Sequence, residues 1–422
     1  MRALVWETDN EPGRATVKVR FGAGYRQFAP EDGAYAALGQ IALVGSGLGE
    51  LGEEDLDRIA TGRKFGFNFA IGDGTFSFEA DTRREDIADQ LYLFAAKFAE
   101  PRWDANPVLR AQAAARLGYD SFAANPAGVI ERDLEYLLRA RDPRFKTPDA
   151  AAIGATSPEG FREVWEPILK QGPMEVMVFG DVDTEATITA LQNTFGALAP
   201  REPLPAGVEA EQYAFPAAQT APQVLHHRGE ADQAAAVVAW PTGGGLGELR
   251  QSRQLEILTQ VFSNRLLDAL REQAGASYAP QVFSSWPVDV DSGGQVLAIA
   301  QLSPERVPDF FAAADSIADD LATNGPSADE LERVTEPLRQ GINRALTGHK
   351  FWLLNLEGAT RYPQRVQMMR TLLSDYTETT PETMKVLAQR YLGARDGWRL
   401  AVLPEGQELA AGYTAPRALA AE

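Results

Sequence analysis

The chain has 422 residues, more than one hydrophobic core usually supports, which predicts two domains of roughly 200 residues each. Its formal net charge of -19 would repel phosphate backbones, and the absence of cysteine excludes disulfides, cysteine-ligated zinc and thiol catalysis. No stretch approaches the ~18 to 20 continuous apolar residues of a membrane helix. We therefore expect a soluble protein with neither a nucleic-acid partner nor a membrane span.

The N-terminal residues leave the compartment open. The run Met1–Asp9 lacks the apolar region of a signal peptide and already has the pattern of a strand. A chain without cysteine suits a reducing or an oxidising compartment equally well. The expected location is cytoplasmic, or periplasmic if a signal-bearing segment precedes this sequence.

Three pairs of segments repeat in the same order in the two halves of the chain. The first pair has a strand pattern that closes in a glycine turn, the second a strand followed by a long amphipathic helix, and the third a strand before an acidic residue. These pairs are residues 14–24 and 233–243, residues 75–87 and 294–306, and residues 174–181 and 398–405.

This repetition predicts an α+β fold made of two homologous domains, each with a largely antiparallel sheet covered by helices on one face. A tract rich in proline, alanine and glycine lies close to the midpoint. We accordingly expect a first domain over residues 1–199, a linker over 200–222 and a second domain over 223–422.

Two glycine-rich stretches lack the further residues of a nucleotide site. Residues 47–52 match G-x-G-x-x-G, but Glu53, Glu54 and Asp55 follow and would oppose a phosphate at the helix N-terminus. Residues 241–249 have no Lys-Ser/Thr pair to hold phosphates. Both stretches are therefore predicted to be turns, and no cofactor is expected in this chain.

The three histidines do not form a metal-binding pattern. His226 and His227 are adjacent in a predicted strand, so they would point to opposite faces of the sheet. His349 has no acidic residue near it at helical ligand spacing. All three are interpreted as surface or packing residues.

An arginine and a tyrosine seven positions apart form the strongest candidate site. The apolar spacing predicts a helix over residues 252–274 that carries Arg271 on its last turn, and Gly275 ends it. Tyr278 then opens a predicted strand over 277–286. An arginine can hold a substrate carbonyl and a phenol can donate to an oxyanion, although a helix-end arginine beside a packed tyrosine has the same pattern.

Residues 263–278 resemble the pitrilysin/insulinase family of zinc metallopeptidases, which includes the mitochondrial processing peptidase subunits. The shared pattern is a helix ending in Leu-Arg-Glu, a short glycine-containing turn and a tyrosine. Residues 178–183 and 195–201 resemble the end of that family's first domain, and the similarity runs in order from Val17 to Leu403. The resemblance implies a peptidase active site to which Arg271 and Tyr278 contribute.

The zinc motif of that family is missing from the aligned positions. Tyr35 and Gly39 stand where the two histidines of H-x-x-E-H belong, and Leu38 stands where the general-base glutamate belongs. The helix expected to carry the last ligand, over residues 107–118, contains no acidic residue. None of these side chains can replace an imidazole or a carboxylate on zinc, so zinc is expected only in a partner.

The resemblance therefore implies a zinc-less subunit, or the C-terminal half of a longer peptidase, that is inactive alone. Tyr278 would hydrogen-bond the oxyanion and Arg271 would hold a substrate carbonyl, while a homologous zinc-bearing partner in a heterodimer supplies the metal for peptide hydrolysis. Two alternatives remain open at this point: a non-catalytic scaffold subunit and a module that captures peptides without cleaving them.

Overall fold

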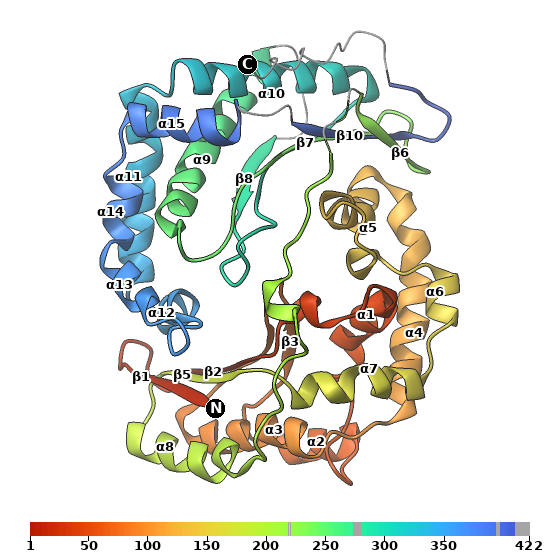
Figure 1. Ribbon diagram of the computed structural model, residues 1–422, viewed down its shortest axis with the longest axis vertical. Coiled ribbons are helices and arrows are strands. Elements are labelled where there is room, and N and C mark those ends of the chain that lie inside the picture. The colour runs from red at the N-terminus through yellow and green to blue at the C-terminus, as the bar shows by residue number, and fades with distance from the viewer. Residues whose placement is uncertain (218, 220, 273–279, 394–396, 410–422) are drawn as a thin grey trace. The chain divides into compact units, whose positions relative to one another are not determined.

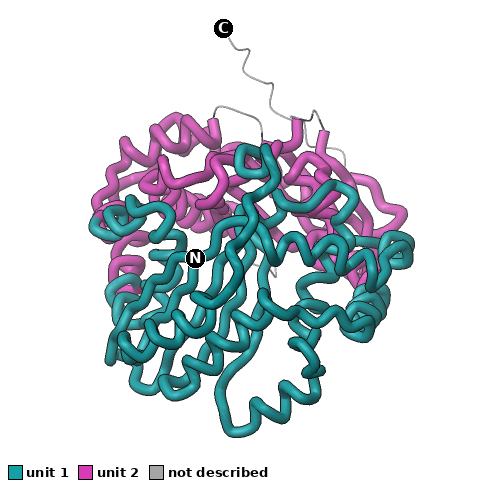
Figure 2. The backbone as a smooth tube through the Cα atoms, turned by 60° about the horizontal axis from the view of Figure 1, so that its bottom comes forward, with its two compact units in different colours: residues 1–117, 148–211, 342–370 teal, residues 118–147, 212–341, 371–422 magenta. Residues whose placement is uncertain are grey.

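The computed structural model describes residues 1–217, 219, 221–272, 280–393 and 397–409 (Figure 1). The chain divides into two compact units (Figure 2). Unit 1 contains residues 1–117, 148–211 and 342–370, and unit 2 contains residues 118–147, 212–341 and 371–422. Each unit thus includes one segment that comes from the opposite half of the sequence.

Unit 1 has a five-stranded sheet with the strand order β1-β5-β2-β4-β3. β1 runs parallel to β5, and the other neighbouring strands are antiparallel. The strands are β1 (Arg2–Glu7), β2 (Ala15–Phe21), β3 (Asn68–Ile71), β4 (Phe76–Thr82) and β5 (Met174–Gly180).

Unit 2 has a five-stranded sheet with the order β6-β10-β7-β9-β8. Here β6 runs parallel to β10, and the remaining pairs are antiparallel. The strands are β6 (Gln223–His227), β7 (Ala234–Pro241), β8 (Gln281–Ser285), β9 (Gln295–Leu302) and β10 (Trp398–Pro404).

The two sheets therefore have the same strand order and the same strand directions. Each predicted pair of segments occupies equivalent positions, because they form β2 and β7, β4 and β9, and β5 and β10. The predicted α+β class and the two largely antiparallel sheets are confirmed.

Helices of unit 1 cover the face of its sheet that carries the alternating apolar residues of β2, β4 and β5. Phe21, Phe76 and Phe78 pack there with Phe98 from α3 and Trp165 from α7 in one continuous core. The helices that begin in this unit are α1 (Gly33–Ala42), α2 (Glu53–Ala60), α3 (Ile87–Ala99), α4 (Ala105–Tyr119), α6 (Ala150–Gly154), α7 (Pro158–Lys170), α8 (Thr184–Asn193), α12 (His349–Leu356) and α13 (Gln364–Arg370).

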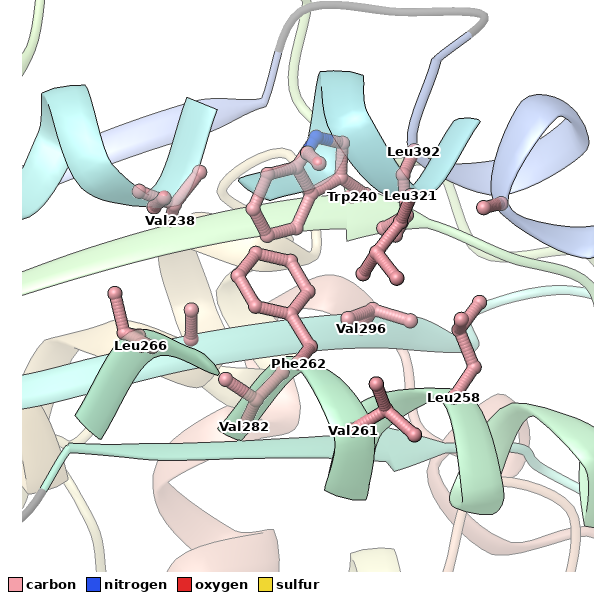
Figure 3. Packing of buried hydrophobic residues seen from close by; sticks show 14 of the residues in the cluster. Val238, Trp240, Leu258, Val261, Phe262, Leu266, Val282, Val296, Leu321 and Leu392 are labelled. Atoms are coloured by element: carbon pink, nitrogen blue, oxygen red, sulfur yellow. The ribbon is translucent and has the colours of Figure 1, made fainter. Parts of the chain in front are cut away.

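The core of unit 2 is built in the same way. Figure 3 shows Trp240 of β7 facing Phe262 of α9, and their ring centroids lie 5.7 Å apart. The helices that begin in this unit are α5 (Pro126–Leu138), α9 (Leu249–Glu272), α10 (Val307–Thr323), α11 (Ala328–Ala345), α14 (Leu372–Thr377) and α15 (Pro381–Tyr391). Within the described residues, no helix combines the length and the apolar character needed to cross a bilayer.

The opposite face of each sheet carries a helix from the other half of the sequence. In unit 1, Leu353 and Leu356 of α12 pack on Met177 and Phe179 of β5. In unit 2, Val129, Leu137 and Leu138 of α5 pack on the second face of β7, β9 and β10. The sequence predicted helices on only one face of each sheet. The structure differs, because α5 and α12 also pack on the second faces.

Buried charges fill the rest of the second face of the unit 1 sheet. The Glu175 carboxylate on β5 is 6% exposed and accepts hydrogen bonds from the backbone amides of Gly358, at 2.7 Å, and Thr360, at 3.0 Å. It also accepts from the Thr360 hydroxyl at 2.6 Å and lies 3.4 Å from Nη1 of Arg20. One carboxylate thus holds the segment that follows α12 against the sheet.

Replacing Glu175 with glutamine should lower the free energy of unfolding by about 2 to 4 kcal/mol, because an amide nitrogen would face donors that now meet carboxylate oxygens. Urea unfolding followed by circular dichroism measures this loss. Glu166→Gln is the matched control, since Glu166 pairs with Arg162 and Lys170 at the surface of α7 and its loss should cost less than about 1 kcal/mol. Equal losses for the two variants would contradict the role assigned to Glu175.

Candidate functional site

The helix that carries the candidate arginine forms where the apolar spacing predicted it. Leu255, Leu258, Phe262 and Leu266 of α9 are each at most 1% exposed and pack against the sheet of unit 2. The helix begins at Leu249, three residues before the predicted start, and its last described residue is Glu272. The amide of Val282 on β8 donates to the Ser263 hydroxyl at 3.3 Å, which joins α9 to the edge strand of the sheet.

Arg271 occupies the last turn of α9 with an exposed side chain. Its neighbour Leu270 is 6% exposed and belongs to the core. No hydrogen bond or ion pair joins the Arg271 guanidinium to another described residue. Its five N–H donors are therefore not engaged by any residue that the structure describes.

Tyr278 and Gly275 lie outside the described residues. The strand predicted to start near Tyr278 is described from Gln281, where β8 begins. The pairing of Arg271 with Tyr278 accordingly stays a prediction.

The positions aligned with the zinc motif lie on α1, where they serve in helix packing. Leu38 is 1% exposed within the core of unit 1. Gly39 allows α7 to approach closely, because a Cβ at this position would lie 2.0 Å from the Trp165 ring. The Trp165 indole donates to the backbone oxygen of Tyr35 at 2.9 Å.

A second glycine completes the contact between α1 and α7. A Cβ at Gly160 would lie 2.1 Å from the Tyr35 hydroxyl. Gly160 is placed by the start of α7, where the Ser157 side chain accepts from the Gly160 amide at 3.0 Å and Pro158 occupies the first turn. Tyr35, Leu38 and Gly39 thus fit a close interface between two helices.

The helix aligned with the last zinc ligand, α4, is also a packing element. Its buried residues are Pro107, Val108, Ala111 and Gln112. The Gln112 amide donates to the backbone oxygen of Thr156 at 2.9 Å and to its hydroxyl at 2.8 Å. Throughout the described part of the chain, no group of three or more histidine, aspartate or glutamate side chains is arranged to hold a metal ion.

Each histidine has a hydrogen-bond partner among the described residues. Nε2 of His226 lies 3.0 Å from the backbone oxygen of Gln407, and Nε2 of His227 lies 2.7 Å from that of Gln233. Nε2 of His349 lies 2.9 Å from the Thr16 hydroxyl on β2. His226 is exposed and His227 and His349 are buried, which agrees with the interpretation of the histidines as surface or packing residues.

The residues of the glycine-rich stretch near position 50 form a tight turn before α2. Leu48 and Leu51 form an isolated antiparallel bridge, and a Cβ at Gly47 would lie 2.0 Å from the Leu51 oxygen. Asp55 accepts from the Gly52 amide at 3.1 Å, so a carboxylate already occupies the N-terminus of α2. The predicted turn is confirmed.

Sequence reasoning missed two buried charged residues, Glu175 and Lys97. Both had a detectable signal, because each is a charged residue inside an otherwise apolar run, residues 174–180 for the first and residues 91–99 for the second. Such a residue in a buried element indicates a specific partner.

Comparison with known proteins finds one family model that matches part of the chain. Residues 157–338 match the family model described as peptidase M16 inactive domain. No curated protein sequence matches the chain.

Solved structures share the fold over nearly the whole chain. A peptidase M16 inactive domain from Pseudomonas fluorescens has a TM-score of 0.77 and 17% identity, with 97% of each chain covered. A protease from Helicobacter pylori has a TM-score of 0.75 and 13% identity, with 95% of this chain and 96% of that chain covered. The periplasmic protease PqqL from Escherichia coli has a TM-score of 0.76 and 16% identity, and this chain, 94% covered, spans 44% of its length.

Proposed function

We propose that this chain, in which residues 157–338 match the peptidase M16 inactive-domain model, is the zinc-less complementary part of a pitrilysin-type metallopeptidase. It pairs with a zinc-bearing homologue, either as a separate subunit or as one half of a longer chain, and peptides are cleaved between the two. The single observation that carries the proposal is the combination of an exposed, helix-end Arg271 with zinc-motif positions that hold Tyr35, Leu38 and Gly39.

In this proposal Arg271 and Tyr278 act on the substrate. The Arg271 guanidinium donates to a backbone carbonyl of the peptide and fixes its register, which the exposure of this side chain supports. The Tyr278 hydroxyl donates to the oxyanion that forms when water attacks the scissile carbonyl. The partner's zinc supplies the Lewis acid that polarises this carbonyl and activates the water.

The packing of α1 against α7 supports placing the metal in the partner. A zinc site on α1 needs imidazole and carboxylate groups that reach into open space. Leu38 and Gly39 instead face the core and the Trp165 ring. In this proposal α1 stabilises the core of unit 1 and takes no part in catalysis.

The proposal is tested by measuring hydrolysis of a fluorogenic peptide library. The samples are this chain after metal removal, an H-x-x-E-H homologue from the same genome, and the two mixed. We expect cleavage to rise at least about tenfold on mixing, and no cleavage by the metal-stripped chain alone.

Two results would reject it: hydrolysis by the isolated, metal-stripped chain, or a stable complex in which mixing gives no gain. The second result would indicate a scaffold subunit. Peptide binding by this chain alone, together with no gain on mixing, would indicate a capture module.

A further inference from the structure

Unit 1 contains a cavity of about 210 Å³ between α2, α3 and the segment that follows α1. Its walls are mainly apolar and include Val44, Leu48, Leu56, Phe65, Phe67 and Leu93. None of these residues belongs to the proposed peptidase site. A cavity of this size and lining is large enough to hold a small organic molecule, since an apolar cavity of ~150 Å³ can hold benzene.

A buried lysine forms part of the cavity wall. Lys97 of α3 is 2% exposed, and its ammonium donates to the backbone oxygen of Ser46 at 2.6 Å. Nζ also lies 5.2 Å from the centroid of the Phe67 ring. Lys97 lines the cavity together with Ser46 and Phe67, the two residues that its ammonium contacts.

The Lys97 ammonium has no carboxylate partner among the described residues. Its remaining contact is the backbone oxygen of Gly47 at 3.5 Å, which is long for a hydrogen bond. An ammonium has three N–H donors, so at least one is available to a group inside the cavity. Burial lowers the pKa of Lys97 to about 7, against the opposing effect of the Asp104 charge.

We propose that this cavity is a binding site for a small apolar monocarboxylate, whose carboxylate accepts from the Lys97 ammonium and whose hydrocarbon part packs among Leu56, Phe67 and Leu93. The ligand would supply the anion that the buried cation lacks, in surroundings where a charge-assisted hydrogen bond is strong. By comparison with benzene in a ~150 Å³ cavity, a ligand of about eight or nine non-hydrogen atoms fits, such as hexanoate.

Two acidic residues of α2 also line the cavity, and both are exposed. Glu53 pairs with Arg110, which offsets its charge at the rim. Asp57 faces solvent, where salt screens its repulsion of an entering anion. At low ionic strength, the negative charge at the rim therefore opposes the entry of an anionic ligand, but it does not block the site.

The test is isothermal titration calorimetry of the full chain with hexanoate, and with hexanamide as the uncharged analogue of the same size. We expect saturable hexanoate binding that is at least about tenfold tighter than hexanamide binding. Lys97→Met should weaken hexanoate binding by the same factor, whereas Lys170→Met, the same change at an exposed lysine of α7, should leave it unchanged.

The pH dependence gives an independent readout. Hexanoate binds the charged form of Lys97, so its affinity should fall as the pH rises above about 7, where the free ammonium loses its proton. Hexanamide affinity should show no such fall.

If Lys97→Met does not fold, Leu56→Trp replaces it as the test variant, because an indole at this position fills the cavity and should abolish binding. Equal affinities for hexanoate and hexanamide, no binding of either, or unchanged binding in the folded test variant would overturn the proposal.

Discussion

Replacing Tyr278 with phenylalanine should lower the turnover of the mixed, active pair by ~10² to 10³, as expected when one donor to an oxyanion is removed. The substitution deletes a single hydroxyl group and leaves the aromatic ring to occupy the same space. We therefore expect the free energy of unfolding to change little and kcat to carry most of the loss, because the hydrogen bond forms fully only in the transition state. Single-turnover hydrolysis of a fluorogenic peptide measures this step directly.

Tyr92→Phe is the matched control for this experiment. Tyr92 lies on α3 with 68% of its surface exposed, so removing its hydroxyl should change turnover less than about twofold. A loss below about threefold in Tyr278→Phe would indicate that the tyrosine serves in packing alone.

Restoring the zinc motif on α1 should destabilise the protein severely instead of creating an active metal site. In a variant with Tyr35→His, Leu38→Glu and Gly39→His, a histidine would replace a glycine whose Cβ position lies 2.0 Å from the Trp165 ring. A carboxylate would also replace Leu38, which is 1% exposed in the core. Overpacking costs about 1 to 3 kcal/mol and an unpaired buried carboxylate adds several more, so a loss of at least about 4 kcal/mol is expected.

Urea unfolding and zinc calorimetry on the triple variant decide this prediction. Gly341→His is the control, because a Cβ at Gly341 on α11 meets no atom within 4 Å and the same change there should be tolerated. A triple variant as stable as the parent chain and able to bind one zinc ion tightly would show that α1 is still free to form the metal site.

The sequence predicted the parts of the fold that depend on local periodicity. The strands near residues 15, 76 and 174 and their counterparts near 234, 295 and 398 have continuous or alternating apolar residues between turn signals, and all six form. The helix below Arg271 was predicted from the spacing of its buried leucines. The interpretation of the three histidines as surface or packing residues rested on their spacing in the sequence, which does not suit metal binding.

Features that depend on contacts distant in sequence could not be predicted in this way. The amphipathic pattern of α5 shows that one face is buried but not which sheet covers it. The partners of Glu175 could not be predicted from the sequence either, because Gly358 and Thr360 lie more than 180 residues away. The partners of Lys97 could not be predicted either, because they are backbone oxygens, which leave no trace in the residue types.

The reciprocal placement of α5 and α12 affects when the protein can finish folding during synthesis. The second face of the unit 1 sheet stays uncovered until α12 (His349–Leu356) has left the ribosome, so Met177 and Phe179 wait for residues made much later. Unit 2 needs β10 (Trp398–Pro404), the neighbour of both β6 and β7, which is made later still. Neither unit can therefore close before its late segment has been made, and we expect both units to finish folding only after β10 has left the ribosome, with apolar strand faces exposed until then.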